Sequence, residues 1–252
     1  MNKKLFLLFV PFILCLSCKK DTPLSFKAES LTEETLDLCQ SQPCPEVTIN
    51  YIEAIGASEV TEKINETITH FITASLLMGE DSIPVAATIR DGTSQFITAY
   101  FDDKRQFPDM AGEYMAEINV TEGYVSKQLI SLELRQYTYT GGAHGYGTTF
   151  FTNIDPDTGD EIPMESLFND LSNFQEFAER KFRAQYGIPE DENINSNGFW
   201  FDDDVFYLPQ AIGFSETDLI LIYNPYDIAS YAQGTIEVLI PLEEASRYLT
   251  FE

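Results

Sequence analysis

The chain has two histidines, and one of them lies among glycines and tyrosines in a segment that could bind a ligand or take part in catalysis. His144 lies in the run 137–147, where residues 141–147 contain four glycines and tyrosines stand on both sides. A histidine can act as an acid–base group or a metal ligand, and glycines allow a backbone with φ > 0 or a close approach to another segment. Two interpretations stay open. The run is a recognition loop between two strands, or a turn in which His144 is hydrogen-bonded in place.

The remaining residues give little support to catalysis. The sequence has no serine nucleophile elbow, no phosphate-cradling Gly-x-Gly-x-x-Gly before a helix and no histidine-rich metal spacing. A carboxylate pair of the glycosidase kind stays open, but with 41 acidic residues a pair at any spacing is expected by chance. We therefore expect a non-enzymatic protein without catalytic residues, metal or cofactor. The alternative is a carboxylate-dependent glycan hydrolase.

Two acidic stretches invite a cation site but are better explained as loops. An EF-hand that begins at Asp155 needs glycine at its sixth position and glutamate at its twelfth. Here Gly159 is fifth and Ser166 is twelfth, so a tight turn is the better interpretation. The triplet Asp202-Asp203-Asp204 is interpreted as a solvated loop.

Residues 1–17 are typical of a secretory signal peptide. Lys3 and Lys4 precede an apolar run, residues 5–14, that is too short to cross a bilayer. The segment ends in Leu16-Ser17-Cys18, which fits a lipobox, so we expect Cys18 to be lipidated. A simple signal peptide that happens to contain cysteines is the alternative. We expect an exported lipoprotein, anchored in the cell envelope at the outer membrane, with residues 18–38 as a polar tether.

Two cysteines remain after Cys15 leaves with the signal peptide and Cys18 carries the lipid. Cys39 and Cys44 lie close in sequence, an exported compartment permits disulfides, and no other cysteine or histidine lies near enough to suggest a metal site. We predict a Cys39–Cys44 disulfide that fixes the start of the first strand. Because the closed loop is very small, its contribution lies at the low end of about 2–4 kcal/mol.

The charge of the chain excludes one class of partner. The sequence has 15 Lys and Arg against 41 Asp and Glu, and removing Lys3 and Lys4 gives 13 − 41 = −28. Such a chain repels phosphates, so nucleic acid is not expected as a partner. It suits a cationic partner, although a well-solvated acidic surface is the ordinary explanation. A hydrophobic content of 44 % is enough for one domain or two small ones.

Periodic patterns predict the elements that must hold these loops. One helix begins at a Ser58 cap and ends at Gly79, and a second spans residues 93–106. A third begins at a Ser172–Gln175 capping box and ends at Gly187. Alternation predicts strands, with a turn at residues 122–123. The strands span residues 47–55, 113–121, 124–139, 148–154, 205–208, 219–223 and 235–240.

Several motifs resemble those of an uncharacterised extracellular domain family. They are residues 139–145 followed by a strand, Asp157-Thr158-Gly159, Leu167-Phe168, and a second signature over residues 224–234. Residues 44–123, which begin Cys-Pro before a strand, resemble the small domain that usually precedes it. This pair is found in the extracellular region of lysozyme-sensing anti-sigma factors of the RsiV kind. It also forms the non-catalytic N-terminal part of peptidoglycan deacetylases of the PdaC kind.

The resemblance implies an α+β fold, a largely antiparallel sheet with about three helices packed on it. It divides the chain into a small N-terminal subdomain over residues 39–123 and a C-terminal domain with the glycine loop over residues 124–252. The sequence shows no sigma-binding segment, no later membrane-spanning run and no deacetylase domain. We therefore expect a stand-alone copy of the binding portion.

This binding module would take a lysozyme-like cationic protein or peptidoglycan as its ligand, or serve as an accessory domain of cell-wall modification. We expect the glycine loop and residues 224–234 to lie together at one end of the sheet. Their tyrosines would then act as anchors for the partner. The candidate binding residues are Tyr139, Gly141, Gly142, His144, Tyr146, Tyr226 and Tyr231.

Overall fold

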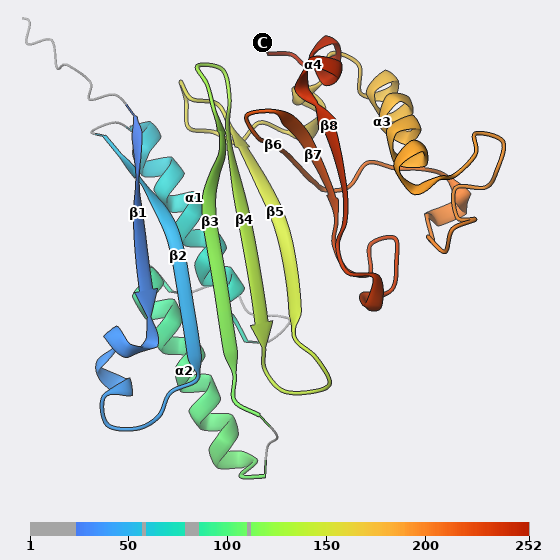
Figure 1. Ribbon diagram of the computed structural model, residues 1–252. Coiled ribbons are helices and arrows are strands. Elements are labelled where there is room, and N and C mark those ends of the chain that lie inside the picture. The colour runs from blue at the N-terminus through green and yellow to red at the C-terminus, as the bar shows by residue number, and fades with distance from the viewer. Residues whose placement is uncertain (1–23, 57–58, 79–85, 110–111, 252) are drawn as a thin grey trace, which may run out of the picture.

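Two sheets organise the computed structural model, which describes residues 24–56, 59–78, 86–109 and 112–251. The predicted signal peptide, Cys18, the Ser58 cap and Gly79 lie outside these ranges. The first sheet has the order β1-β2-β3-β4-β5 and the second the order β6-β7-β8 (Figure 1). The strands are β1 (Ser25–Thr32), β2 (Glu46–Ile55), β3 (Met115–Val125), β4 (Ile130–Tyr139), β5 (Tyr146–Ile154), β6 (Ala211–Phe214), β7 (Asp218–Tyr223) and β8 (Ile236–Pro241). Of the neighbouring strand pairs in the two sheets, β2 and β3 run parallel and the others run antiparallel. This confirms the largely antiparallel α+β fold.

Two long helices connect β2 to β3 and cover one face of the first sheet. They are α1 (Glu59–Ser75) and α2 (Ile89–Gln106). In α1 the residues Ile64, Ile68 and Ile72 are fully buried, because their spacing of four places them on one face of a helix. The first predicted helix is therefore confirmed over the described residues. None of the described helices is long and apolar enough to span a membrane.

The third long helix, α3 (Leu171–Tyr186), covers the second sheet, and a short α4 (Leu242–Ala245) follows β8. The N-cap of α3 is Asp170, whose carboxylate accepts a hydrogen bond from the Asn173 backbone N–H at 3.1 Å. The predicted Ser172–Gln175 capping box is wrong, because Ser172 already lies in the first helical turn. Gly187 adopts φ +65° and ends the helix as predicted.

The second sheet packs against the face of the first sheet that α1 and α2 leave uncovered. A Cβ atom at Gly213 of β6 would lie 1.9 Å from the Phe151 ring of β5. The Asn153 amide donates to the Ile212 carbonyl at 2.8 Å, and the Phe214 N–H donates to the Ser131 hydroxyl at 3.1 Å. The described chain therefore stacks as helices, sheet, sheet and helix (Figure 1).

The predicted turn at residues 122–123 and the predicted domain boundary after residue 123 both fall inside a strand, because β3 continues to Val125. The register of the β3–β4 pair shifts between Glu122 and Tyr124, so Gly123 marks a bulge rather than a turn. A Cβ atom there would lie 2.5 Å from the Phe214 carbonyl oxygen, which explains the glycine. The first sheet runs on to Ile154, so a division into residues 39–123 and 124–252 cuts through it.

The tether predicted for residues 18–38 is also corrected. Ser25–Thr32 forms β1, paired along its length with β2 from Ser25–Ile55 to Thr32–Thr48. Because β1 is an edge strand with mostly exposed or half-buried side chains, it shows no clear alternation in the sequence. In the C-terminal half, the predicted strand 205–208 is absent from both sheets, and β6 lies beside it at residues 211–214.

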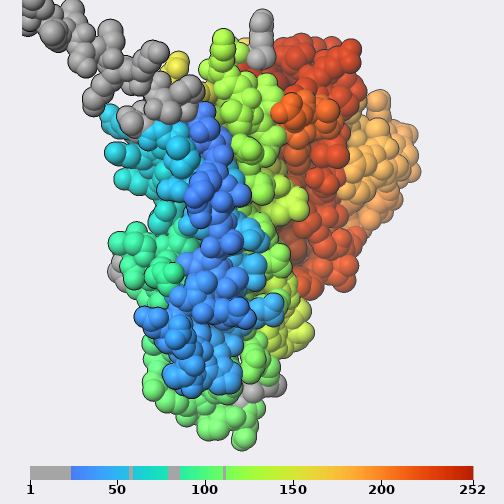
Figure 2. All heavy atoms as spheres, turned by 60° about the vertical axis from the view of Figure 1, so that its left-hand side comes forward, coloured from blue at the N-terminus to red at the C-terminus, as the bar shows by residue number. Residues whose placement is uncertain are grey.

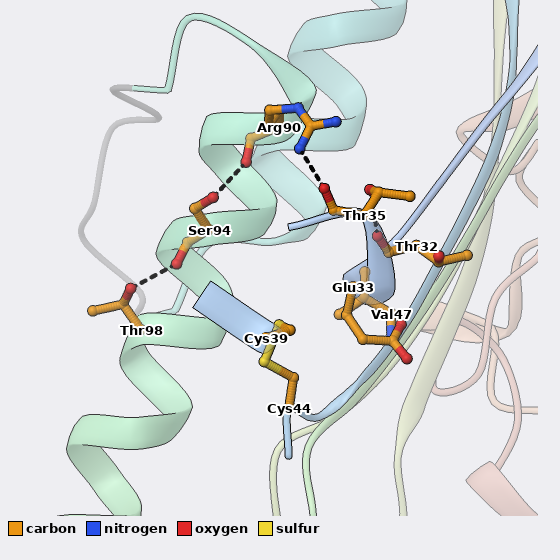
Figure 3. Close-up of a disulfide and its surroundings, with 9 residues drawn as sticks. All are labelled: Thr32, Glu33, Thr35, Cys39, Cys44, Val47, Arg90, Ser94 and Thr98. Carbon is orange, nitrogen blue, oxygen red and sulfur yellow. Dashed lines mark hydrogen bonds between the residues drawn. A yellow bond between two sulfur atoms is a disulfide. The ribbon is translucent and has the colours of Figure 1, made fainter. Parts of the chain in front are cut away.

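Three contacts fasten the segment that joins β1 to β2 (Figure 3). The predicted Cys39–Cys44 disulfide is present, with Cα atoms 5.4 Å apart, just before β2 begins. The Arg90 guanidinium of α2 donates to the Thr35 carbonyl at 2.9 Å. The Glu33 carboxylate accepts from the Val47 N–H at 2.9 Å. These contacts hold the start of β2 in place.

Candidate functional site

The glycine loop after β4 meets the loop that joins β7 to β8. The Tyr231 hydroxyl donates to the Gly145 carbonyl at 2.8 Å, and the Tyr231 ring stacks on His144 with centroids 3.8 Å apart. The Asn224 amide bonds both backbone groups of Thr149, accepting from its N–H at 2.8 Å and donating to its carbonyl at 3.0 Å. The two loops lie together, as the sequence led us to expect.

Four aromatic side chains gather where these loops meet, and we call them the aromatic cluster: His144, Tyr146, Tyr226 and Tyr231. The exposed fractions are 40 % for Tyr146 and 53 % for Tyr226, which are large values for aromatic side chains. The Tyr226 and Tyr231 ring centroids are 5.8 Å apart. The structure therefore brings together four of the seven candidate binding residues.

Tyr226 has a strained backbone. Its φ of +76° lies in the left-handed region, which costs a non-glycine residue about 1–2 kcal/mol. The turn around it holds this geometry, because the Asp227 carboxylate accepts from the Asn224 N–H at 2.7 Å and the Tyr226 N–H donates to the Ala229 carbonyl at 3.1 Å. An exposed aromatic residue held in a strained turn is typical of a recognition site.

Tyr146 remains a neutral hydrogen-bonding group at ordinary pH. Partial burial raises the pKa of its hydroxyl, and the negative charge of Asp227 raises this pKa further. The aromatic cluster therefore presents phenol hydroxyls beside a carboxylate.

The other three candidate residues build the glycine loop. The Tyr139 hydroxyl donates to the Gly142 carbonyl at 3.1 Å and closes the loop. Gly141 and Gly142 both have φ of +99°, and a Cβ atom at either would meet nothing within 4 Å. These two glycines therefore serve the shape of the turn. Nδ1 of His144 lies 2.9 Å from the Gly145 carbonyl oxygen. This contact agrees with the interpretation of the run as a turn in which His144 is hydrogen-bonded in place.

Beside the aromatic cluster lies a groove of about 600 Å³ that the sequence did not point out. Outward-facing side chains of β3, β4 and β5 form its floor, and residues 231–235 form a wall. Two cross-strand rows make the floor, Glu117–Tyr137–Gly147 and Asn119–Arg135–Thr149. Tyr231 lines the groove and also belongs to the aromatic cluster, so the two features are continuous.

A sequence signal for the groove exists in β4. Glu133, Arg135 and Tyr137 alternate with the buried Leu132 and Leu134, and the alternation leads directly into the glycine loop. The outward positions of this strand are therefore candidates for any site beside the loop.

The acidic stretches form turns rather than cation sites. The Asp155 carboxylate accepts from the backbone N–H groups of Asp157 and Thr158, and the Lys63 ammonium donates to Asp160 at 2.7 Å, which lowers the pKa of Asp160. The predicted tight turn is confirmed. Residues 202–204 form an exposed 3-10 turn. Among the residues that the structure describes, no group of three or more His, Cys, Asp or Glu is placed to hold a metal ion.

Comparisons with known proteins agree with the resemblance. Residues 38–146 match the family model described as Deacetylase PdaC, and residues 165–243 match the model described as Protein of unknown function (DUF3298). A DUF3298 family member from Bacteroides fragilis NCTC 9343 has a similar solved structure, with a TM-score of 0.63 and 20 % identity over 90 % of this chain and 94 % of that one. A DUF3298 family protein from Pseudomonas aeruginosa PAO1 is similar at a TM-score of 0.57, with the same identity and coverage. No curated protein matches the chain.

Proposed function

We propose that this chain, which joins a PdaC-type segment to a DUF3298 domain in the fold of DUF3298 family proteins, is a non-enzymatic binding module of the bacterial cell envelope. Its partner is a cationic protein of the lysozyme kind, captured at the aromatic cluster. The resemblance to lysozyme-sensing proteins supports the partner class. An accessory binding role also suits residues 38–146, which match the family model described as Deacetylase PdaC.

The observation that carries the proposal is the exposed, strained Tyr226 beside Tyr146. Protein interfaces are anchored by a few tyrosine, tryptophan and arginine side chains that become fully buried on binding. Here the exposed Tyr226 ring lies next to Tyr231, which is itself stacked on His144. A rigid aromatic platform of this kind loses little conformational entropy when a partner covers it.

The charge of the chain supports a cationic partner. The net charge is −26, and Asp227 stands beside the two exposed tyrosines. A field of this sign speeds the encounter with a basic protein, whereas the aromatic anchors slow its release.

The alternative of a carboxylate-dependent hydrolase finds less support. A catalytic acid of that kind is usually held protonated by burial. Among the described residues the buried polar side chains are threonine, serine and asparagine, and no Asp or Glu is buried. We therefore favour binding over glycan hydrolysis.

Binding kinetics at two salt concentrations test the proposal. Residues 19–252 should be immobilised, since this fragment keeps β1 in the first sheet. Raising the salt concentration should slow the association of a lysozyme far more than it speeds dissociation, because exposed charges are screened within about 8–10 Å. A dissociation rate that rises as strongly as the association rate falls would indicate non-specific charge pairing and would contradict the proposal.

We also propose that Cys18 carries a lipid that holds the module at the outer membrane. The motif Leu16-Ser17-Cys18 supports this assignment. Metabolic labelling with a fatty-acid analogue should mark the wild-type protein and not Cys18→Ala, which should appear in the soluble exported fraction. An unlabelled wild-type protein would show that the anchor does not exist.

A further inference from the structure

The groove beside the aromatic cluster has an ordered floor of outward-facing side chains. Glu117 of β3 stands opposite Tyr137 of β4, and Asn119 stands opposite Arg135. On the other side of β4, Gly147 and Thr149 complete the two rows. Figure 2 shows the green strands of the first sheet meeting the red C-terminal segment, the segment that supplies the wall.

Glycines fix the aromatic part of this floor. A Cβ atom at Gly145 would lie 2.3 Å from the Tyr137 hydroxyl oxygen, and one at Gly147 would lie 3.3 Å from its ring. The Tyr137 ring therefore lies over these two positions, half-buried and lining the groove. Tyr231 supplies a second ring, fixed by its hydrogen bond to Gly145 and by the stacked His144. Two immobilised rings give the groove flat apolar surfaces with polar tips.

The polar part of the floor offers both acceptors and donors. The Glu117 carboxylate is held by a hydrogen bond from the Asn119 amide at 3.1 Å. The Arg135 guanidinium is held by Glu133, with Nε at 2.7 Å from the carboxylate oxygen. Carboxylate oxygens accept and guanidinium N–H groups donate, and ligand hydroxyls can do both.

The groove is nearly neutral in a strongly acidic protein. The charged side chains that line it are Glu117 and Arg135, and their charges cancel. Counting Glu133 beside Arg135 leaves one negative charge, against −26 for the whole chain. A cationic ligand would find more negative charge elsewhere, and an anionic ligand would meet the field of the acidic chain.

We propose that this groove binds a segment of a neutral oligosaccharide. The apolar faces of sugar rings lie on Tyr137 and Tyr231, while hydroxyl groups bond Glu117 and Arg135. A volume of about 600 Å³ lies within the range of pockets that hold small organic ligands. The inference does not depend on the proposed capture of a cationic protein. Because Tyr231 belongs to both sites, the two ligands should weaken each other's binding.

Calorimetric titration of residues 19–252 with neutral trisaccharides tests the inference. The trisaccharides to be tested are chitotriose, cellotriose and mannotriose, and tetralysine serves as a cationic peptide probe. At least one trisaccharide should bind with a Kd below about 1 mM, a modest affinity for a small ligand in an open groove. Tetralysine should not bind in the groove.

Two variants locate the binding and one controls for charge. Glu117→Ala and Arg135→Ala should each weaken trisaccharide binding about tenfold, because each removes a charged hydrogen-bonding group. Glu53→Ala removes another exposed glutamate, from β2 of the same sheet, and should leave the affinity unchanged. Trisaccharide binding that survives both groove variants would overturn the inference. So would the absence of binding by all three sugars, or tetralysine binding that Glu117→Ala abolishes. These outcomes leave the lysozyme proposal to its own test.

Discussion

At the scale of single residues, Tyr226 carries the account of binding. We expect Tyr226→Gly to weaken lysozyme binding by about 2 kcal/mol, about 30-fold, mainly through faster dissociation, because a buried aromatic anchor is lost. The free energy of unfolding should change by less than about 1 kcal/mol, since release of the left-handed strain offsets the backbone entropy of glycine.

Binding kinetics and urea unfolding of the same variant separate these two effects. Phe150→Ala is a matched control. Phe150 is similarly exposed, at 42 %, but contacts Phe71 of α1 on the opposite face of the first sheet. Equal losses of affinity in the two variants would contradict the role of Tyr226.

A partly buried hydrogen bond predicts how stability depends on alkaline pH. The Tyr114 hydroxyl donates to the Asp103 carboxylate at 2.6 Å, and burial, with Asp103, raises the pKa of Tyr114 to about 12. A tyrosine in the unfolded chain titrates near about 10. The folded state therefore binds the proton more tightly, so this contribution to stability is complete below about pH 10 and is lost as the pH rises towards about 12.

Tyr114→Phe isolates this contribution from those of the other tyrosines. The unfolding free energy of the wild type should fall more steeply between about pH 9 and 12 than that of the variant. Urea unfolding across this pH range measures the difference. Parallel curves would show that Tyr114 is not the group responsible.

At the scale of elements, the sequence predicted best where one face of a helix or strand is buried. Ile64, Ile68 and Ile72 show the spacing of four, and α1 follows from it. The pattern fails for β1, none of whose side chains is fully buried, and for β6, whose four residues are all buried. Neither strand alternates, so neither leaves a period-two signal.

The sequence also predicts only those parts of the site that carry a local signal. Glycines and aromatics mark the two loops in the sequence, and their contact was expected. The groove was missed because Glu117 and Arg135 are distant in sequence and become neighbours through the β3–β4 register. Gly123 resembles a turn glycine in the sequence, because a glycine required by close tertiary contact with Phe214 leaves the same signal.

The start of α3 gives a prediction at this scale. Asp170→Ala should lower the free energy of unfolding by about 1 kcal/mol, because it removes the acceptor for the Asn173 N–H. Ser172→Ala, two residues along the same turn, should change it by less than about 0.5 kcal/mol. Urea unfolding compares the two variants. A larger loss from Ser172→Ala would restore the capping box expected from the sequence.

At the scale of the whole molecule, β1 begins at one end of the first sheet and the glycine loop lies at the other (Figure 1). Six residues lie between Cys18 and Ser25, so the seven steps from one to the other reach about 25 Å at most. If Cys18 is lipidated, the end of the sheet that carries the β3–β4 turn faces the membrane. The aromatic cluster then points away from it, towards partners in the surrounding compartment.

Energy transfer on lipid vesicles tests this orientation. The lipidated protein should carry a donor fluorophore at Val125→Cys, near the β3–β4 turn, or at Gly142→Cys in the glycine loop. Transfer to acceptor lipids should be stronger from position 125 than from position 142. Equal transfer, or the reverse order, would contradict the orientation.

Calorimetry at physiological salt measures whether the protein captures a lysozyme-like partner selectively. Residues 19–252 should be titrated with a panel of lysozymes and with unrelated proteins of equal positive charge. We expect at least one lysozyme to bind with a Kd below about 100 μM and the charge-matched proteins to bind more weakly than this. If no lysozyme reaches that affinity, or if every basic protein binds alike, the proposal is wrong.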